Sequence, residues 1–295
     1  MKQQQQNIKE YLQSKYHPIT VTHYLLEINR YLDAVKNPEK AGYNDILAYI
    51  GELRGKGYTT EKLLTALLAL KQYYHWLVKT GKRNDHPCRS LNLKDKRSKQ
   101  IQLQDLFSEA ELSLLMERKE KYKIVEIKNK VLMSLLIYQG LTTGELCALK
   151  VQDINLSKGT VYVKGISNTN SRTIGLHISQ IMLLNKYIHE MRPKLLKRKY
   201  AKAGSDVLLL NWLGTPHTPD IVDNFIESFK KLFPGRKLNP TRIRQSVIAN
   251  LLKQGKDVRV VQVYMGYKSP DTIEKYKQSN IEQLQAGIDK SHPLR

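Results

Sequence analysis

A polar and strongly basic stretch, SLNLKDKRSKQIQLQD over residues 90–105, interrupts the apolar pattern of this chain. The chain has 295 residues, which is long for a single hydrophobic core and sufficient for two. A segment with so few apolar residues is typical of a tether between domains. We therefore expect two domains, residues 1–89 and 107–295, joined by a basic linker at 90–106.

The charge balance indicates a polyanionic partner. Lys and Arg number 49 against 27 Asp and Glu, which gives a formal net charge of +22. Each cation that neutralises a phosphate releases condensed counterions, so this excess favours strong, salt-dependent binding to nucleic acid. Charge alone leaves two alternatives open: a soluble protein that is merely basic, and one that binds an acidic membrane surface.

Other whole-chain features argue against several classes. Cys88 and Cys147 are the only cysteines and lie far apart, so neither a disulfide framework nor a zinc site is predicted. The eight histidines show no metal-ligand spacing. No apolar run approaches the roughly 18 to 20 residues of a membrane span, and the N-terminus has no apolar signal region. We expect a cytoplasmic protein without metal, cofactor or membrane contact.

The first domain is expected to be helical, because apolar residues recur every three or four positions over residues 7–78. Proline or glycine stop signals separate the apolar runs at 17–18, 37–38 and 55–57. Thr59 or Thr60 can cap the last helix. Four short helices of this kind can bury one small core.

The second domain has a mixed pattern. Ser108 and Glu111 form a Ser-x-x-Glu capping box before an apolar run. The segments TVYV (160–163) and RTIGL (172–176), with the polar bend ISNTNS between them, predict a β-hairpin. A helix over 181–191 is expected to stop at Pro193, and the basic stretch KLLKRKYAK after it either continues as a helix or contacts DNA. The predicted fold is therefore mainly α, with a small antiparallel sheet.

Two motifs in the second domain point to a family. YQGLTTGELCALKVQDI covers residues 138–154, and LNPTRIRQSVIANLLKQGKDVRVVQVYMGYKSPDTIEKY covers residues 238–276. Both closely resemble active-site segments of tyrosine recombinases, the DNA strand-exchange family that includes phage integrases and Xer recombinases. The resemblance implies that Arg244 is the arginine of the His-x-x-Arg box and that Tyr276, ten residues after Gly266, is the nucleophile.

The resemblance covers nearly the whole chain and implies its architecture. Residues 1–89 are similar to the helical, SAM-like core-binding domain, and residues 107–295 to the catalytic-type domain. The linker would let the two close as a clamp around duplex DNA. The implied DNA-binding residues are Lys71, His75, Lys79, Lys82, Arg83 and Lys268. A solvated helix face is the alternative account of the basic residues in the first domain.

Several positions depart from the family pattern. Thr142 stands in place of an arginine, Thr241 in place of the box histidine, and Tyr267 follows the glycine. Ser167, or Ile166 with another gap placement, stands where the family has its hairpin lysine. Cationic donors stabilise the charge that develops on the phosphate, and losing one costs on the order of 3 to 4 kcal/mol. Threonine lacks the charge and fork of a guanidinium and cannot act as a general base. We therefore predict a degenerate active site.

Three cations are candidates to compensate. Lys164 lies on the same strand face as Ile166, about 6.6 Å away, although a surface lysine on a DNA-facing strand is the favoured account. Arg172 begins the second hairpin strand. Arg242 adjoins Thr241 but lies about 100° around the helix. Tyr267 could itself donate a hydroxyl hydrogen bond to the phosphate.

The tail after Tyr276 contains the apolar residues Ile281, Leu284 and Ile288. The resemblance implies a C-terminal helix that docks into a neighbouring protomer, giving a homo-oligomer on DNA, a dimer or tetramer, or an assembly with a related recombinase. So short a stripe could equally fold back in cis.

Two functional hypotheses follow. The leading one is a tyrosine recombinase, integrase or transposase of a mobile element, which cleaves double-stranded DNA through a 3′-phosphotyrosyl intermediate. The alternative is a catalytically inactive, recombinase-like accessory or structural protein that binds DNA. A basic helical RNA-binding protein is a remote third.

Overall fold

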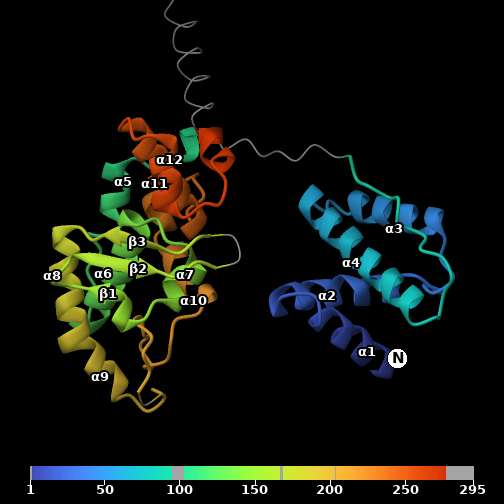
Figure 1. The fold of residues 1–295 in the computed structure, drawn as a ribbon, viewed down its shortest axis with the longest axis horizontal. Helices are drawn as coiled ribbons and strands as arrows, with labels where there is room; N and C mark the ends of the chain where they lie inside the picture. Colours follow the sequence, from blue (N-terminus) through green and yellow to red (C-terminus); the bar gives the residue numbers. More distant parts are fainter. Residues whose placement is uncertain (1, 95–102, 167–168, 203, 277–295) are drawn as a thin grey trace, which may run out of the picture. The chain divides into compact units, whose positions relative to one another are not determined.

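The computed structural model describes residues 2–94, 103–166, 169–202 and 204–276. The chain divides into two compact units, Met1–Lys99 and Gln100–Arg295, each with its own hydrophobic core. The predicted fold class is confirmed, because helices dominate both units and one small antiparallel sheet is present (Figure 1).

The first unit is a bundle of helices, namely α1 (Lys2–Gln13), α2 (Pro18–Ala34), α3 (Tyr43–Gly55) and α4 (Thr60–Lys79). Helix α4 packs against the other three. Local signals explain the boundaries: the His17 side chain accepts a hydrogen bond from the backbone N–H of Ile19, and the Thr59 side chain accepts one from Lys62. A buried hydrogen bond of 2.6 Å joins the hydroxyls of Tyr31 and Tyr74 across the core.

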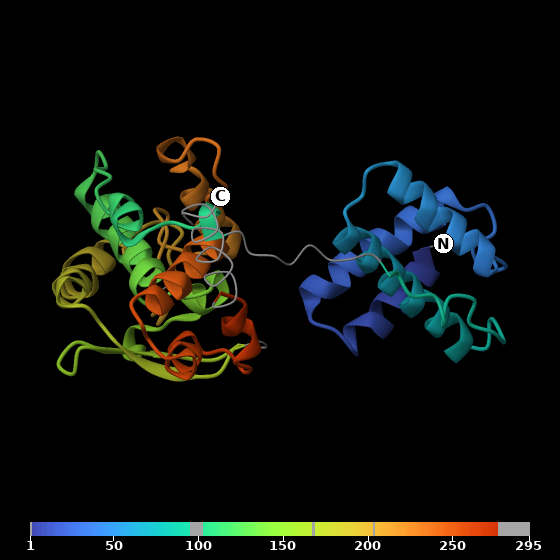
Figure 2. The same cartoon turned by 90° about the horizontal axis from the view of Figure 1, so that it is seen from above.

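The second unit holds the sheet and the remaining helices (Figure 2). Its helical elements are η1 (Leu103–Asp105), α5 (Glu109–Leu114), α6 (Lys123–Tyr138), α7 (Thr143–Ala148), η2 (Val151–Asp153), α8 (Ile178–Lys186), η3 (Tyr187–Met191), α9 (Arg192–Leu196), α10 (Pro219–Glu227), η4 (Lys230–Leu232), α11 (Pro240–Lys253) and α12 (Val258–Met265). The buried helix α6 contacts α7, α8 and α11.

The sheet consists of β1 (Ile154–Asn155), β2 (Thr160–Val163) and β3 (Arg172–Gly175), paired antiparallel in that order. Its register places Val161 opposite Ile174 and Val163 opposite Arg172. Side chains alternate between the two faces of a strand, so Arg172 shares the buried face with Ile174. The strand therefore directs a guanidinium into the protein interior.

The helix expected to stop at Pro193 runs past it to Leu196, so the basic stretch begins as a continued helix, one of its two predicted alternatives. A π-helical turn, η3, follows α8, and α9 continues with Pro193 in its first turn. A proline is tolerated in a first turn because its missing N–H would have no intrahelical partner there. Periodicity identified this helix, but it could not reveal the π-helical turn that restarts it.

Candidate active site

Tyr276 lies inside the second unit. Residues 271–276 are helical, and Tyr276 is only 3% exposed. Burial raises the pKa of its phenol, with a smaller contribution from Tyr267, while the charges of Arg244 and Arg242 and a hydrogen bond with Gln245 act in the opposite direction. The phenol therefore keeps its proton at neutral pH, and the two arginines favour its ionised form.

Arg244 joins the two sequence motifs. It is 5% exposed on α11, and its Nη1 donates to the carbonyl of Gly140 in the first motif. Its Nη2 donates to the carbonyl of Met265 at 2.5 Å, and its Nε donates to the hydroxyl of Tyr267 at 3.2 Å. The guanidinium carbon also lies 4.7 Å from the centre of the Tyr267 ring. These contacts hold the guanidinium in one orientation.

Thr142 serves as a helix cap. Its hydroxyl accepts a hydrogen bond from the backbone N–H of Glu145 at 3.2 Å, and the Glu145 carboxylate accepts one from the backbone N–H of Thr142 at 2.9 Å. This reciprocal capping box starts α7 and turns the Glu145 side chain into the interior, where the residue is 1% exposed.

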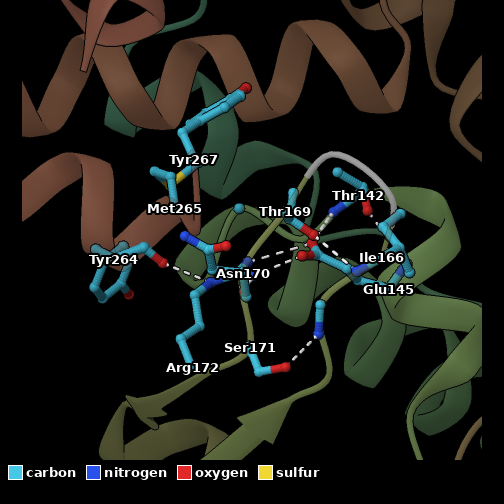
Figure 3. Close-up of polar contacts among 12 residues, drawn as sticks. Thr142, Glu145, Ile166, Thr169, Asn170, Ser171, Arg172, Tyr264, Met265 and Tyr267 are labelled. Carbon is cyan, nitrogen blue, oxygen red and sulfur yellow. Dashed lines mark hydrogen bonds and ion pairs between the residues drawn. The ribbon is translucent and has the colours of Figure 1, made fainter. Parts of the chain in front are cut away.

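Arg172 pairs with that carboxylate from strand β3. Its Nη1 lies 2.6 Å from Oε1 of Glu145 and its Nη2 lies 3.3 Å from Oε2, so the pair is bidentate. Its Nε donates to the carbonyl of Tyr264 at 2.8 Å (Figure 3). The Arg172 side chain therefore connects strand β3 with the capping box of α7 and with the end of α12.

Glu145, Arg172 and Arg244 form a buried group that we call the Glu145 cluster. Arg244 Nη1 lies 3.7 Å from Oε2 of Glu145. Burial pushes the pKa of Glu145 upward, but hydrogen bonds from Arg172 and Thr142 and the charges of both arginines outweigh it and hold the pKa below its ordinary value. Two guanidiniums and one carboxylate leave a net charge of +1, and one of the three groups, Arg244, lowers the pKa of Tyr276 by its charge, so the cluster favours an anion there.

The hairpin loop docks on the end of α12. The backbone N–H of Asn170 donates to the carbonyl of Gly266 at 2.8 Å, and Thr169 forms an antiparallel bridge with Tyr267. Gly266 has φ +72°, and a Cβ there would collide with the Arg172 guanidinium. Glycine is therefore required at this position for two reasons, its backbone conformation and the close approach of Arg172.

Comparison with known proteins gives the same assignment as the two motifs. Residues 105–283 match the model described as the phage integrase family. The chain belongs to the phage integrase family. It is similar to tyrosine recombinase XerD of Oceanobacillus iheyensis, at 25% identity over 93% of this chain and 92% of the relative. Tyrosine recombinase XerC of Thermodesulfovibrio yellowstonii is 27% identical over 93% and 90%.

Solved structures support the fold. The XerH site-specific recombinase bound to its palindromic difH substrate superposes with a TM-score of 0.70. Its identity to this chain is 19%, over 91% of this chain and 79% of that one. The predicted family is thus confirmed by sequence, and the fold by structure.

The other positions that the sequence singled out as substituted or compensating candidates are spread more widely. Thr241 is exposed in the first turn of α11, and Arg242 is half-buried with its Nη2 3.6 Å from Asp105. Lys164 is exposed directly after β2, and in the part of the chain that the structure describes no hydrogen bond or ion pair joins it to the Glu145 cluster. Ser167 lies outside the described residues.

The predicted DNA-binding residues of the first unit fall into two groups. Lys79 and Lys82 are exposed, with their ammonium groups 5.7 Å and 4.9 Å from the rings of Tyr11 and Trp76. Arg83 instead pairs with Asp85 at 2.7 Å and donates to two backbone carbonyls, which indicates a structural role.

The other predicted DNA-binding residues are His75, Lys71 and Lys268, and the first two also make contacts within their own unit. His75 is exposed and stacks on Tyr11, and its pKa is lowered by partial burial and by neighbouring cations. Lys71 Nζ donates to the carbonyl of Arg89 at 3.2 Å, so it also braces its own unit. Lys268, in the second unit, is exposed.

Glu145 is the site residue whose role sequence reasoning missed. It was recognised only as a match to the family pattern, although its place three residues after Thr142 is the spacing of a capping box. That spacing would have predicted the cap, but not the pair with Arg172.

Within the described residues, no group of three or more His, Cys, Asp or Glu side chains could hold a metal ion. No described helix is long and apolar enough to cross a membrane.

Proposed function

We propose that this chain is a site-specific recombinase that cleaves and rejoins double-stranded DNA through Tyr276. The observation that carries the proposal is the Glu145 cluster, whose uncompensated positive charge lies near the buried phenol. The Glu145 cluster and the Tyr276 phenol would both contact the scissile phosphate of the DNA. The curated relatives, named as tyrosine recombinases, support the same reaction class.

In the proposed reaction the Tyr276 hydroxyl oxygen attacks the phosphorus and loses its proton. The bond from phosphorus to the 5′ oxygen breaks, that oxygen takes up a proton, and a 3′-phosphotyrosyl link remains. A guanidinium has five N–H donors, and three of those on Arg244 go to Gly140, Met265 and Tyr267. The N–H groups that no described residue accepts would bind the non-bridging oxygens.

Arg172 would act as a positioning residue. Its donors go to Glu145, to the Tyr264 carbonyl and, at 3.4 Å, to the Asn170 carbonyl, so it neutralises the carboxylate rather than binding DNA. With Glu145 neutralised, the charge of Arg244 remains available to the phosphate. Thr142 contributes no charge, so we expect slow cleavage compared with a site that holds two phosphate-binding arginines.

The proposed partners are duplex DNA and further copies of this chain. The predicted oligomerisation helix lies outside the described residues, and the domain limits 1–89, 90–106 and 107–295 stay part of the proposal. That this chain is the integrase or transposase of a mobile element remains a prediction, because the curated relatives reported above are named XerC and XerD.

A nicked suicide duplex tests strand cleavage. The nick lets the short fragment with the free 5′ end diffuse away, so that religation is prevented. If the nucleophile is active, a covalent protein–DNA complex then accumulates, and it survives denaturing electrophoresis. We expect an adduct that peptide mapping assigns to Tyr276 and that Tyr276→Phe abolishes. An adduct that persists in Tyr276→Phe would place the nucleophile elsewhere.

A second candidate function, an inactive DNA-binding accessory protein, is favoured by one observation. Thr142 is engaged as a helix cap and Thr241 is exposed, so neither replaces a catalytic cation or base. Tight, salt-sensitive duplex binding without any adduct would establish this function instead.

A further inference from the structure

In the first unit, cations from two helices gather around the ring of Tyr11, where the end of α1 packs against α4. The Lys15 ammonium, just after α1, lies 4.5 Å from the centre of this ring and donates to the Tyr11 hydroxyl at 2.7 Å. The Lys79 ammonium, at the end of α4, lies 5.7 Å from the same ring centre. Two ammonium groups from different helices are therefore held at one aromatic ring.

His75 lies at the same ring. It is exposed on α4, and its imidazole stacks on Tyr11 with the ring centroids 6.4 Å apart. The ring of His86 lies 6.4 Å from that of His75, but its Nε2 donates to the backbone carbonyl of Lys71 at 3.0 Å. Among the described residues no hydrogen bond engages the ring nitrogens of His75, so they are available to a ligand.

The surroundings of His75 are strongly positive. Partial burial is the largest cause that lowers its pKa, and the charges that lower the pKa further are those of Lys15, His86, Lys79 and Arg89. Lys15, Lys79 and Arg89 are exposed, and in the described part of the chain no ion pair joins any of them to a carboxylate. Like charges held close together repel, and an anion placed among them would relieve that repulsion.

We propose that Tyr11 and the cations around it bind a backbone phosphate of duplex DNA, and that His75 takes up a proton from solvent when this phosphate binds. The ammonium groups of Lys15 and Lys79 and the protonated imidazole would donate to the phosphate oxygens. The resemblance implies His75 and Lys79 as separate DNA contacts, whereas here they act as one site with Lys15 and Arg89. The proposal rests on the proposed function for its ligand, DNA, but not on strand cleavage.

Phosphate binding and protonation of His75 should favour each other. In the free protein the neighbouring cations hold the pKa of His75 below its ordinary value of 6.5, so the imidazole is mostly neutral at pH 7. A bound phosphate brings a negative charge to the ring and raises that pKa. The complex then holds a proton that the free protein lacks. Duplex affinity should therefore rise as the pH falls through the range between the two pKa values.

The pH dependence of duplex affinity tests the proton uptake. Binding of a fluorescent duplex is followed by anisotropy with full-length Tyr276→Phe protein, in which no adduct can form at that residue, at constant ionic strength. His75→Gln in this background removes the titrating ring, and His23→Gln removes an exposed histidine of α2 as the control. Between about pH 7.5 and 5.5, we expect affinity to rise about threefold more with His75 present than with His75→Gln. His23→Gln should behave as its parent.

The histidine-ring signals in nuclear magnetic resonance report the pKa of His75 directly. In the free protein this pKa should rise in Lys15→Gln and in Lys79→Gln, because each change removes a neighbouring positive charge. It should also rise when the duplex binds the parent, while the pKa of His23 should not change.

The salt dependence of binding tests the two lysines. Lys15→Gln and Lys79→Gln should each weaken binding and reduce the number of counterions released by about one. Lys62→Gln is the matched control, because Lys62 also lies on α4 with its ammonium 5.7 Å from a tyrosine ring, that of Tyr58. This control should leave both the affinity and the salt dependence unchanged.

Three results would overturn the proposal. They are equal pH dependence with and without His75, a His75 pKa that does not rise when the duplex binds, and equal losses of affinity in Lys15→Gln, Lys79→Gln and Lys62→Gln. The third result would show that the first unit attracts DNA only through its overall charge. Absence of an adduct at Tyr276 on the nicked duplex would remove strand cleavage but leave this phosphate site standing, whereas absence of any duplex binding would remove both.

Discussion

Arg172 and Glu145, 27 positions apart in the chain, form a bidentate ion pair whose side chains are 4% and 0% exposed. Arg172 comes from strand β3, and Glu145 comes from helix α7, three residues after its cap Thr142. A buried carboxylate without a partner would be costly, so each member of this pair requires the other in the folded protein.

Replacing one partner of this pair should destabilise the second unit more than replacing both. Arg172→Leu leaves a buried carboxylate with Arg244 at 3.7 Å as its nearest cation, and should lower the free energy of unfolding by about 3–5 kcal/mol. The double variant Arg172→Leu/Glu145→Leu should recover most of that loss. Urea unfolding measures both, and strictly additive losses would show that the two side chains are not coupled.

Gly266→Ala should be more harmful than the matched change Gly255→Ala. Both glycines have positive φ, +72° and +79°, and each follows a helix. Alanine at Gly255 meets nothing within 4 Å, so its cost should be the backbone strain alone, about 1–2 kcal/mol. Alanine at Gly266 also displaces the Arg172 guanidinium and should cost at least about 1–3 kcal/mol more, as overpacking does. Equal unfolding free energies would mean that Arg172 moves without penalty.

Arg83→Ala and Lys79→Ala should have opposite signatures. Arg83 is bound by Asp85 and by the carbonyls of Glu39 and Ala41, so its loss should destabilise the first unit by about 1–3 kcal/mol. Lys79 is exposed, so its loss should leave stability unchanged and, if it contacts a phosphate, reduce the salt dependence of duplex affinity by about one counterion. Thermal unfolding and binding at several salt concentrations measure the two effects, and a reversal of these signatures would contradict the assignment.

The free energy of unfolding should fall in a specific acid window because of His217. Its pKa is about 4 in the folded protein, against 6.5 ordinarily, so the unfolded chain binds the proton first as the pH falls. Stability should therefore be lost progressively between pH 6.5 and 4, on the order of 3 kcal/mol in total. His217→Leu should lack this part of the pH dependence, measured as the difference between the two proteins in urea unfolding. Parallel stability profiles would show that the imidazole is not held neutral.

Local signals were predictable, and they placed most elements correctly. The capping residues Thr59 and Ser108 begin helices as expected, and the hairpin strands start at Thr160 and Arg172. Such features depend on residues close together in the chain, so their spacing is enough to identify them. The π-helical turn before Pro193 was not predicted, because such a turn has no equivalent signal.

By itself the sequence determined the family, the mainly helical fold with its small sheet, and the positions of Arg244 and Tyr276 within their motifs. The fold follows from periodicity along the chain, whereas the family and the two positions follow from the resemblance of the two motifs to tyrosine recombinases. Only the tertiary structure decided which of the candidate cations, Lys164, Arg172 and Arg242, enters the interior. That choice depends on strand register and on a carboxylate from another element, because a buried guanidinium needs acceptors for its N–H groups, and Glu145 supplies them together with the opposite charge.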